Sequence, residues 1–134
     1  MKTTMRIILM GMIVMVFSSI TLTAQTADDS RVKVLDESNF TKNTKSGVVV
    51  VDFYADWCKP CKAMAPILEQ VAFETNGKIS FAKLNVDNAK QLSSQYNVTG
   101  IPCLIVFRNG KEVERFVGFQ QKDVLMQKLA KYME

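Results

Sequence analysis

The sequence of 134 residues contains no histidine and only three cysteines. The absence of histidine excludes Ser-His-Asp and Cys-His catalysis, haem held by histidine, and zinc sites that need a histidine ligand. Three cysteines in one chain cannot complete a four-cysteine zinc or iron–sulfur site.

The excess of basic over acidic residues is also small. Lys2 and Arg6 supply two of the 17 basic residues, which leaves 15 basic against 13 acidic residues after position 24. A net charge of +2 gives no basic stripe of the kind that binds nucleic acid.

The remaining composition is that of one globular domain. Apolar residues make up 48% of the chain and charged residues 22%. This balance supports a buried core and argues against a disordered or collagen-like chain. The length fits a single domain, and we expect a monomer.

Residues 1–24 have the pattern of a secretory signal peptide. Lys2 and Arg6 precede an apolar run that ends near Leu22, and Ala24 is a suitable last residue before cleavage. We therefore expect a leader over 1–24, a loose lead-in over 25–30 and the folded domain over 31–134. The mature protein would then be periplasmic or otherwise extracytoplasmic, where disulfides persist. The alternative is an uncleaved membrane anchor, for which the run is barely long enough. No cysteine ends the run, so we do not expect a lipid-anchored lipoprotein.

The hydrophobic pattern after the leader predicts an α/β domain. We expect strands at 32–35, 48–54, 79–86, 103–107 and 112–117, and helices at 36–45, 60–75, 87–96 and 122–133. The order is β-α-β-α-β-α-β-β-α. Strands that alternate with helices should be parallel, whereas the Asn109-Gly110 turn makes the last pair antiparallel. We expect Asp36–Ser38 to cap the first helix, Asp87 or Asn88 to cap the third, and Pro66 to kink the second.

The strand at 48–54 carries one unexpected residue. It is a nearly continuous run of β-branched and aromatic side chains, which is typical of a strand buried on both faces. Asp52 is the only charge inside it. A carboxylate in such a strand requires a reason, because burial disfavours the charged form.

Cys58 and Cys61 stand where this buried strand ends and a helix begins. The N–H groups and the dipole of a helix N-terminus stabilise a thiolate, which is the nucleophile of disulfide exchange. The second thiol lies one turn further along and can resolve a mixed disulfide. A zinc half-site would need two more ligands, and haem attachment would need a histidine where Lys62 stands. An inert structural bridge needs neither the adjacent Trp57 nor the strand-to-helix turn, so the spacing favours redox chemistry.

The chain resembles the thioredoxin family along almost its whole mature length. The matching segments, in order, are Val51–Ala55, Trp57–Cys61, Ala82–Asp87, Gly100–Pro102, Phe107–Gly110 and Gly118. Of these segments, only the cysteine motif is specific to the family by itself. The whole set of segments taken together is also specific to it. The resemblance implies a thioredoxin-like three-layer fold with a central mixed β-sheet flanked by helices. It also implies a protein-disulfide oxidoreductase with no cofactor and no resident metal.

The resemblance also assigns roles at the redox centre. Cys58 would be the attacking thiol and Cys61 the resolving thiol of a Cys58–Cys61 redox disulfide. Asp52 matches the family's buried carboxylate, which assists proton transfer at the resolving cysteine, and burial should raise its pKa into a useful range. The alternative for Asp52 is a partly exposed strand end. Lys83 matches the family's lysine near that carboxylate, or is an ordinary solvated lysine.

A second set of matching residues implies a docking surface for substrate. Pro102 matches the family's cis-proline, beside which Ile101 offers backbone groups to an extended substrate. Trp57, Ile101 and Gly118 would line the surface, with Lys59 and Pro60 between the cysteines; each could equally be a packing residue. The implied partners are proteins that carry a disulfide or a dithiol, together with a membrane or soluble redox partner that recharges the pair. The direction of the reaction is left open, because it depends on that partner.

Three positions depart from the family pattern. Lys59 replaces the usual glycine between the cysteines, where a cation either favours the Cys58 thiolate and a more oxidising couple or is merely tolerated. Tyr54 replaces a tryptophan. Cys103 replaces a threonine after Pro102, as a buried small apolar residue or as a third thiol near the redox pair.

Two other functions compete with catalysis. The domain could be a non-catalytic binding module that docks a partner, or that holds a soft metal such as Cu(I) through Cys58, Cys61 and Cys103. It could also be a membrane-tethered domain if the leader is retained.

Overall fold

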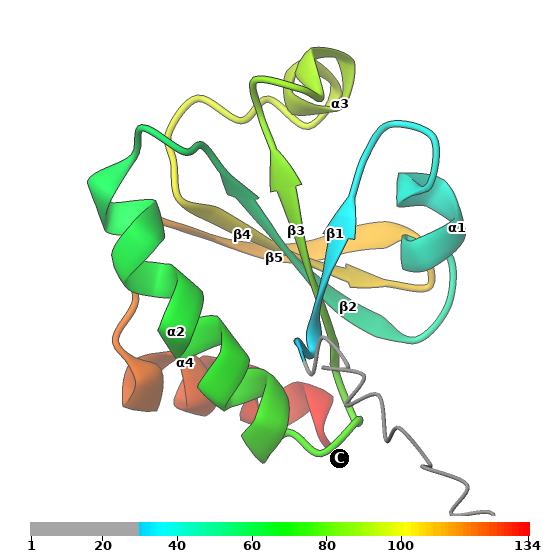
Figure 1. Ribbon diagram of the computed structural model, residues 1–134. Helices are drawn as coiled ribbons and strands as arrows, with labels where there is room; N and C mark the ends of the chain where they lie inside the picture. The colour runs from blue at the N-terminus through cyan, green and yellow to red at the C-terminus, as the bar shows by residue number, and fades with distance from the viewer. Residues whose placement is uncertain (1–29) are drawn as a thin grey trace, which may run out of the picture.

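The computed structural model describes residues 30–134 (Figure 1). The predicted leader at 1–24 and all but the last residue of the lead-in at 25–30 lie outside the described residues. Five strands form one sheet in the order β1-β3-β2-β4-β5. Their bounds are Val32–Leu35, Val48–Tyr54, Ser80–Asn85, Cys103–Arg108 and Lys111–Val117 for β1 to β5. Every predicted strand is present, and the predicted α/β class with a central mixed sheet is confirmed.

The direction of β4 differs from the prediction. β3 is parallel to both β1 and β2 as expected, but β4 runs antiparallel to β2, with Asp52 opposite Leu104. The cause is the placement of α3 (Lys90–Gln95), which lies towards the end of the sheet where β3 finishes (Figure 1). After α3 the chain stays at this end of the sheet and enters β4 there. β4 therefore runs in the direction opposite to β2 and β3.

Helices cover both faces of the sheet. α2 (Lys59–Glu74) and α4 (Lys122–Leu129) lie on one face, and α1 (Phe40–Thr44) and α3 pack on the other (Figure 1). α2 runs through Pro66 as one helix. The predicted last helix ends early, at Leu129, and continues as the 3₁₀ turn η1 (Ala130–Tyr132). Over residues 30–134, none of the helices combines the length and the apolar character needed to cross a membrane.

The two predicted helix caps are wrong in detail. The carboxylate of Asp36 accepts the backbone N–H groups of Ser38 and Asn39, which makes a turn, and α1 starts only at Phe40. α3 starts at Lys90 after Ala89 and has no side-chain cap. Short polar side chains compete for nearby backbone groups in turns as well as at helix starts, so their presence alone does not fix where a helix begins.

The sheet separates two clusters of buried side chains. The α2-side core joins side chains of β2 and β4, such as Val50 and Leu104, to Met64, Leu68 and Val71 of α2. The α1-side core contains the alternate residues of the same strands, among them Val51, Phe53, Cys103, Ile105 and Phe107, together with Phe40 of α1. Successive side chains of a strand point to opposite faces, so Asp52 faces the α2 side with Val50.

Candidate active site

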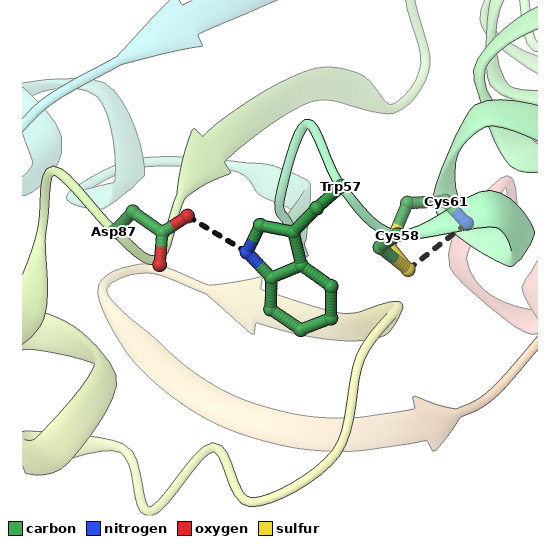
Figure 2. The surroundings of a disulfide bond; sticks show 4 residues. All are labelled: Trp57, Cys58, Cys61 and Asp87. Atoms are coloured by element: carbon green, nitrogen blue, oxygen red, sulfur yellow. Dashed lines mark hydrogen bonds between the residues drawn. A yellow bond between two sulfur atoms is a disulfide. The ribbon is translucent and has the colours of Figure 1, made fainter.

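The two cysteines of the motif lie at the N-terminus of α2, directly after β2. Cys58 has extended backbone angles and is the N-cap of the helix. Its Sγ accepts the backbone N–H of Cys61 at 3.2 Å (Figure 2). Pro60, at the second helical position, has no N–H to satisfy and a backbone angle suited to a first helical turn. The sulfur of Cys58 therefore stands where a helix N-terminus favours negative charge.

Cys58 and Cys61 form a disulfide, and their Cα atoms are 5.2 Å apart. Both residues are buried, with 5% and 3% of their surface exposed. They form a small cluster with Ala55, against which Tyr54 and Ile101 pack. The structure thus brings the predicted docking residue Ile101 next to the redox pair.

Trp57 is held beside the disulfide by Asp87, a residue that the sequence pattern did not assign to the site. Trp57 is 69% exposed, and its indole Nε1–H donates to Oδ2 of Asp87 at 2.9 Å (Figure 2). Asp87 follows β3, and its own N–H donates to the side chain of Asn85. The carboxyl ends of the parallel strands β2 and β3 meet at one edge of the sheet, and that rule would have placed Asp87 near Trp57.

Asp52 is the only acidic or basic side chain in β2. It is 3% exposed, and its Oδ1 has no hydrogen-bond partner among residues 30–134. Burial raises the pKa of Asp52 to about 7, against a smaller opposing effect of the charge on Lys83. The direction is the one predicted from the sequence. A carboxyl group with this pKa can both take up and release a proton near neutral pH.

A cavity of about 540 Å³ lies between α2 and the sheet beside Asp52. Asp52 and Cys61 both line it, at the side of α2 that faces β2 and β3. Pro66 and Leu68 supply apolar wall, and Lys83 lies beside Asp52. The remaining lining residues are Val32, Tyr54, Ala55, Asp56, Lys62, Ala65 and Glu69. The buried carboxyl therefore faces a space that also reaches Cys61.

Lys83 lies beside Asp52 by strand register. The two residues are direct partners of the parallel β2–β3 pair. Lys83 is half-buried, and its Nζ lies 5.8 Å from the centre of the Tyr54 ring. It is therefore not a freely solvated lysine, and its charge stabilises the ionised form of Asp52.

The other predicted docking residues are Pro102, Gly118, Lys59 and Pro60. The Ile101–Pro102 peptide bond is cis. Gly118, at a φ of +88° that favours glycine, donates its N–H to the carbonyl of Pro102 at 2.7 Å. Lys59 and Pro60 are exposed at the start of α2.

Cys103 belongs to a different region. It is a free thiol with 1% exposure, and it packs in the α1-side core with Phe53 and Ile105 rather than in the cluster around the disulfide. Burial raises the pKa of the Cys103 thiol. The structure supports a buried apolar role for it. No group of three or more Cys, Asp or Glu side chains that could hold a metal ion is found within residues 30–134, so the three cysteines do not assemble into a copper site there.

Comparison with known proteins agrees with the geometry. The Thioredoxin family profile matches residues 31–131. The chain is 47% identical over 102 residues to a thioredoxin of Staphylococcus haemolyticus, covering 76% of this chain and 97% of that protein. It is 42% identical over 101 residues to a thioredoxin of Chlamydia trachomatis, covering 75% and 98%. A mutant thioredoxin from Halobacterium salinarum NRC-1 superimposes with a TM-score of 0.71 at 33% identity, covering 78% of this chain and 94% of that one.

A cysteine pair at a helix N-terminus above a buried carboxyl is suited to thiol–disulfide exchange. The fold around it is thioredoxin-like, as the sequence predicted. The chain belongs to the thioredoxin family, whose members are protein-disulfide oxidoreductases.

Proposed function

We propose that the protein is an exported oxidoreductase that exchanges disulfides with protein substrates, with Cys58 as nucleophile, Cys61 as resolving thiol and Asp52 as the proton partner of Cys61. The observation that carries the proton-transfer role is the shared cavity. Asp52 is buried, and within the described residues its Oδ1 has no hydrogen-bond partner. Its pKa is about 7, and it lines the same space as Cys61.

The first step is attack by Cys58. In the reduced protein its thiolate is stabilised by the N-terminus of α2, where the N–H of Cys61 points at the sulfur. The thiolate attacks one sulfur of a substrate disulfide. A bond forms between Cys58 and that sulfur, the substrate disulfide breaks, and the other substrate sulfur leaves as a thiolate that takes a proton from solvent.

The second step is resolution by Cys61. Its thiol transfers a proton to the carboxylate of Asp52, and the resulting sulfur anion attacks Cys58. The Cys58–Cys61 bond forms, the bond between Cys58 and the substrate sulfur breaks, and the second substrate sulfur leaves and takes the proton from Asp52. The substrate has then gained two electrons from the cysteine pair and two protons, one from solvent and one from Cys61 by way of Asp52. The reverse sequence oxidises a substrate dithiol.

Substrate binds across the exposed surface beside the disulfide. Trp57 and Ile101 provide apolar contacts there, and the chain at Ile101–Pro102 offers backbone groups to an extended segment. Gly118, which directly follows β5, holds the chain at Pro102 by donating its N–H to the carbonyl of Pro102. A separate redox protein, membrane-bound or soluble, returns the cysteine pair to its working state.

Export rests on the sequence of residues 1–24, which have the charge and hydropathy pattern of a cleaved leader. Edman sequencing of the purified protein tests it. A mature N-terminus near Gln25 supports export with cleavage, whereas an intact leader in the membrane fraction supports tethering.

Stopped-flow kinetics test the proton-transfer role. Asp52→Asn should slow resolution of the mixed disulfide by about ten- to a hundredfold, while attack by Cys58 slows far less. Asp56→Asn is the matched control, because Asp56 is an exposed carboxylate at the same cavity. Equal slowing of both steps, or equal effects of the two substitutions, contradicts the role of Asp52.

A further inference from the structure

An ion pair on β5 depends on an irregularity in the strand. Glu112 and Arg115 are three residues apart, so in a regular strand their side chains would point to opposite faces. The register between β4 and β5 shifts at Val113: Glu112 is opposite Phe107, whereas Glu114 is opposite Val106. This bulge returns Glu112 and Arg115 to the same face, and they form a two-pronged ion pair.

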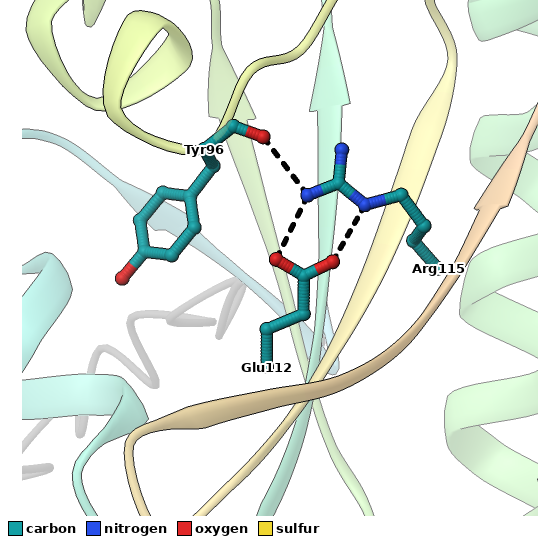
Figure 3. A network of polar contacts seen from close by, with 3 residues as sticks. All are labelled: Tyr96, Glu112 and Arg115. Atoms are coloured by element: carbon teal, nitrogen blue, oxygen red, sulfur yellow. Dashed lines mark hydrogen bonds and ion pairs between the residues drawn. The ribbon is translucent and has the colours of Figure 1, made fainter.

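The guanidinium of Arg115 also reaches a second element. Its Nη2 donates to Glu112 at 2.8 Å and to the backbone carbonyl of Tyr96 at 2.8 Å (Figure 3). Tyr96 is the C-cap residue of α3. Carbonyl groups at a helix C-terminus lack partners within the helix, and a positive charge there is favourable. Glu112 thus orients Arg115, and Arg115 fastens the end of α3 to β5.

Tyr96 is the fixed start of the loop that carries the docking residues. Its ring packs against Phe40 and Phe107, with ring centres 5.5 and 5.3 Å away. The next residue, Asn97, turns the chain with a φ of 51°. Five residues further on lies Pro102, directly after Ile101.

β5 and Gly118, the residue directly after it, support this loop at three points. Arg115 holds its start through the carbonyl of Tyr96. Val117 contacts its middle so closely that a Cβ on Gly100 would lie 3.2 Å from Cγ1 of Val117. Gly118 holds its end through the carbonyl of Pro102. Of the three contacts, only that of Arg115 depends on a long polar side chain.

We propose that Arg115, oriented by Glu112, is a positioning residue for substrate docking: it fixes the loop from Asn97 to Pro102 so that Ile101 meets an extended protein substrate. This inference rests on the proposed function, because it assigns the loop to substrate binding. It predicts an effect on protein substrates and not on the chemistry of Cys58.

Steady-state kinetics of Arg115→Gln test the proposal. With insulin as substrate and dithiothreitol as reductant, KM should rise about three- to tenfold while kcat stays within about twofold. The rate with hydroxyethyl disulfide, which is too short to lie along the loop, should not change. Arg115→Lys keeps the positive charge but lacks the planar guanidinium group. Its KM for insulin should therefore lie between that of the wild type and that of Arg115→Gln. Lys122→Gln is the matched control: it removes the same charge and breaks a similarly exposed ion pair, to Glu74, between α4 and α2.

An unchanged KM for insulin in Arg115→Gln overturns the proposal, and so does an equal loss of rate on both disulfides. If Arg115→Gln does not fold, Glu112→Gln takes its place, with a smaller rise in KM expected and an unchanged KM again contradicting the proposal. Amide hydrogen exchange separates this inference from the proposed function. If the wild-type protein fails to reduce insulin, the proposed function fails. If amide exchange at residues 98–101 is the same in Arg115→Gln as in the wild type, the positioning role itself is overturned.

Discussion

Each face of the sheet buries an ionisable side chain, but only one of these two side chains shares a space with the redox pair. Asp52 of β2 faces the α2 side, and Cys103 of β4 faces the α1 side, opposite Phe53. Burial raises the pKa of both side chains. Asp52 lines a cavity together with Cys61 and Lys83, whereas Cys103 packs among aromatic and aliphatic side chains. Burial alone therefore does not create a functional group; a shared space and a reaction partner are also needed.

The largest expected difference is between the cysteines themselves. Cys58→Ser should reduce insulin turnover to the background of dithiothreitol alone, because it removes the attacking sulfur. Cys103→Ala should retain turnover within about twofold. In the reduced wild-type protein, peptide mapping after brief alkylation near neutral pH should find Cys58 modified first and Cys103 last, because a buried thiol reacts slowly. Modification of Cys103 before Cys58 would refute the assignment of the nucleophile.

The second expected effect is a pH-dependent gain in stability for Asp52→Asn. The pKa of Asp52 is about 7 in the folded protein and 3.8 ordinarily, so between these values the folded protein holds a proton that the unfolded chain has released. Burial of the carboxyl then destabilises the oxidised protein progressively from about pH 4 to about pH 7, and by a constant amount above that. A shift of about three pKa units corresponds to at most about 4 kcal/mol.

Guanidinium unfolding of both proteins across this pH range measures the effect. The free energy of unfolding of Asp52→Asn should exceed that of the wild type at pH 8 and approach it near pH 4. A difference that does not vary with pH would show that the carboxyl titrates normally.

Cys103→Ala should have a smaller effect of the opposite sign. Removal of a buried sulfur leaves a small void, which should lower the free energy of unfolding by about 1 kcal/mol. The loss should be the same at pH 5 and pH 7.5, because the raised pKa keeps the thiol neutral at both. A loss that grows across this range would place a titrating group at Cys103.

The smallest expected effect concerns the exposed Lys59. A cation beside Cys58 stabilises the thiolate relative to the uncharged disulfide. One pKa unit on Cys58 corresponds to about 30 mV for a two-electron couple, and solvent screening reduces this to a fraction. Lys59→Gln should therefore lower the reduction potential by roughly 5–20 mV in low salt. Equilibration with a glutathione buffer measures it; an unchanged potential would mean that Lys59 is simply tolerated.

The sequence alone predicted those parts of the site that depend on local pattern. The run of β-branched residues around Asp52 placed β2, and the cysteine spacing after it placed the redox pair at a helix start. These features follow from a few adjacent residues, so one sequence contains them. The raised pKa of Asp52 followed from the same run, because a charge inside a buried strand is poorly solvated.

The parts that depend on contacts between distant segments were not predictable in this way. The direction of β4 is set by where α3 lies. The hydrogen bond from Trp57 to Asp87 joins residues that follow two different strands, and they can be placed together only once β2 and β3 are known to be parallel neighbours. The pair of Glu112 and Arg115 is hidden by the bulge at Val113, since strand periodicity assigns the two residues to opposite faces. Each case needs the order, direction or register of the strands in the sheet, which the hydrophobic pattern does not supply.

The most direct test is the titration of Asp52 itself. Carbon-13 NMR of the oxidised protein, labelled at aspartate carboxyl carbons and assigned with Asp52→Asn, follows the carboxyl as pH changes. A midpoint at about 7 for Asp52 is the expected result. A midpoint near the ordinary value of 3.8 would contradict the proposal that Asp52 exchanges a proton with Cys61 near neutral pH.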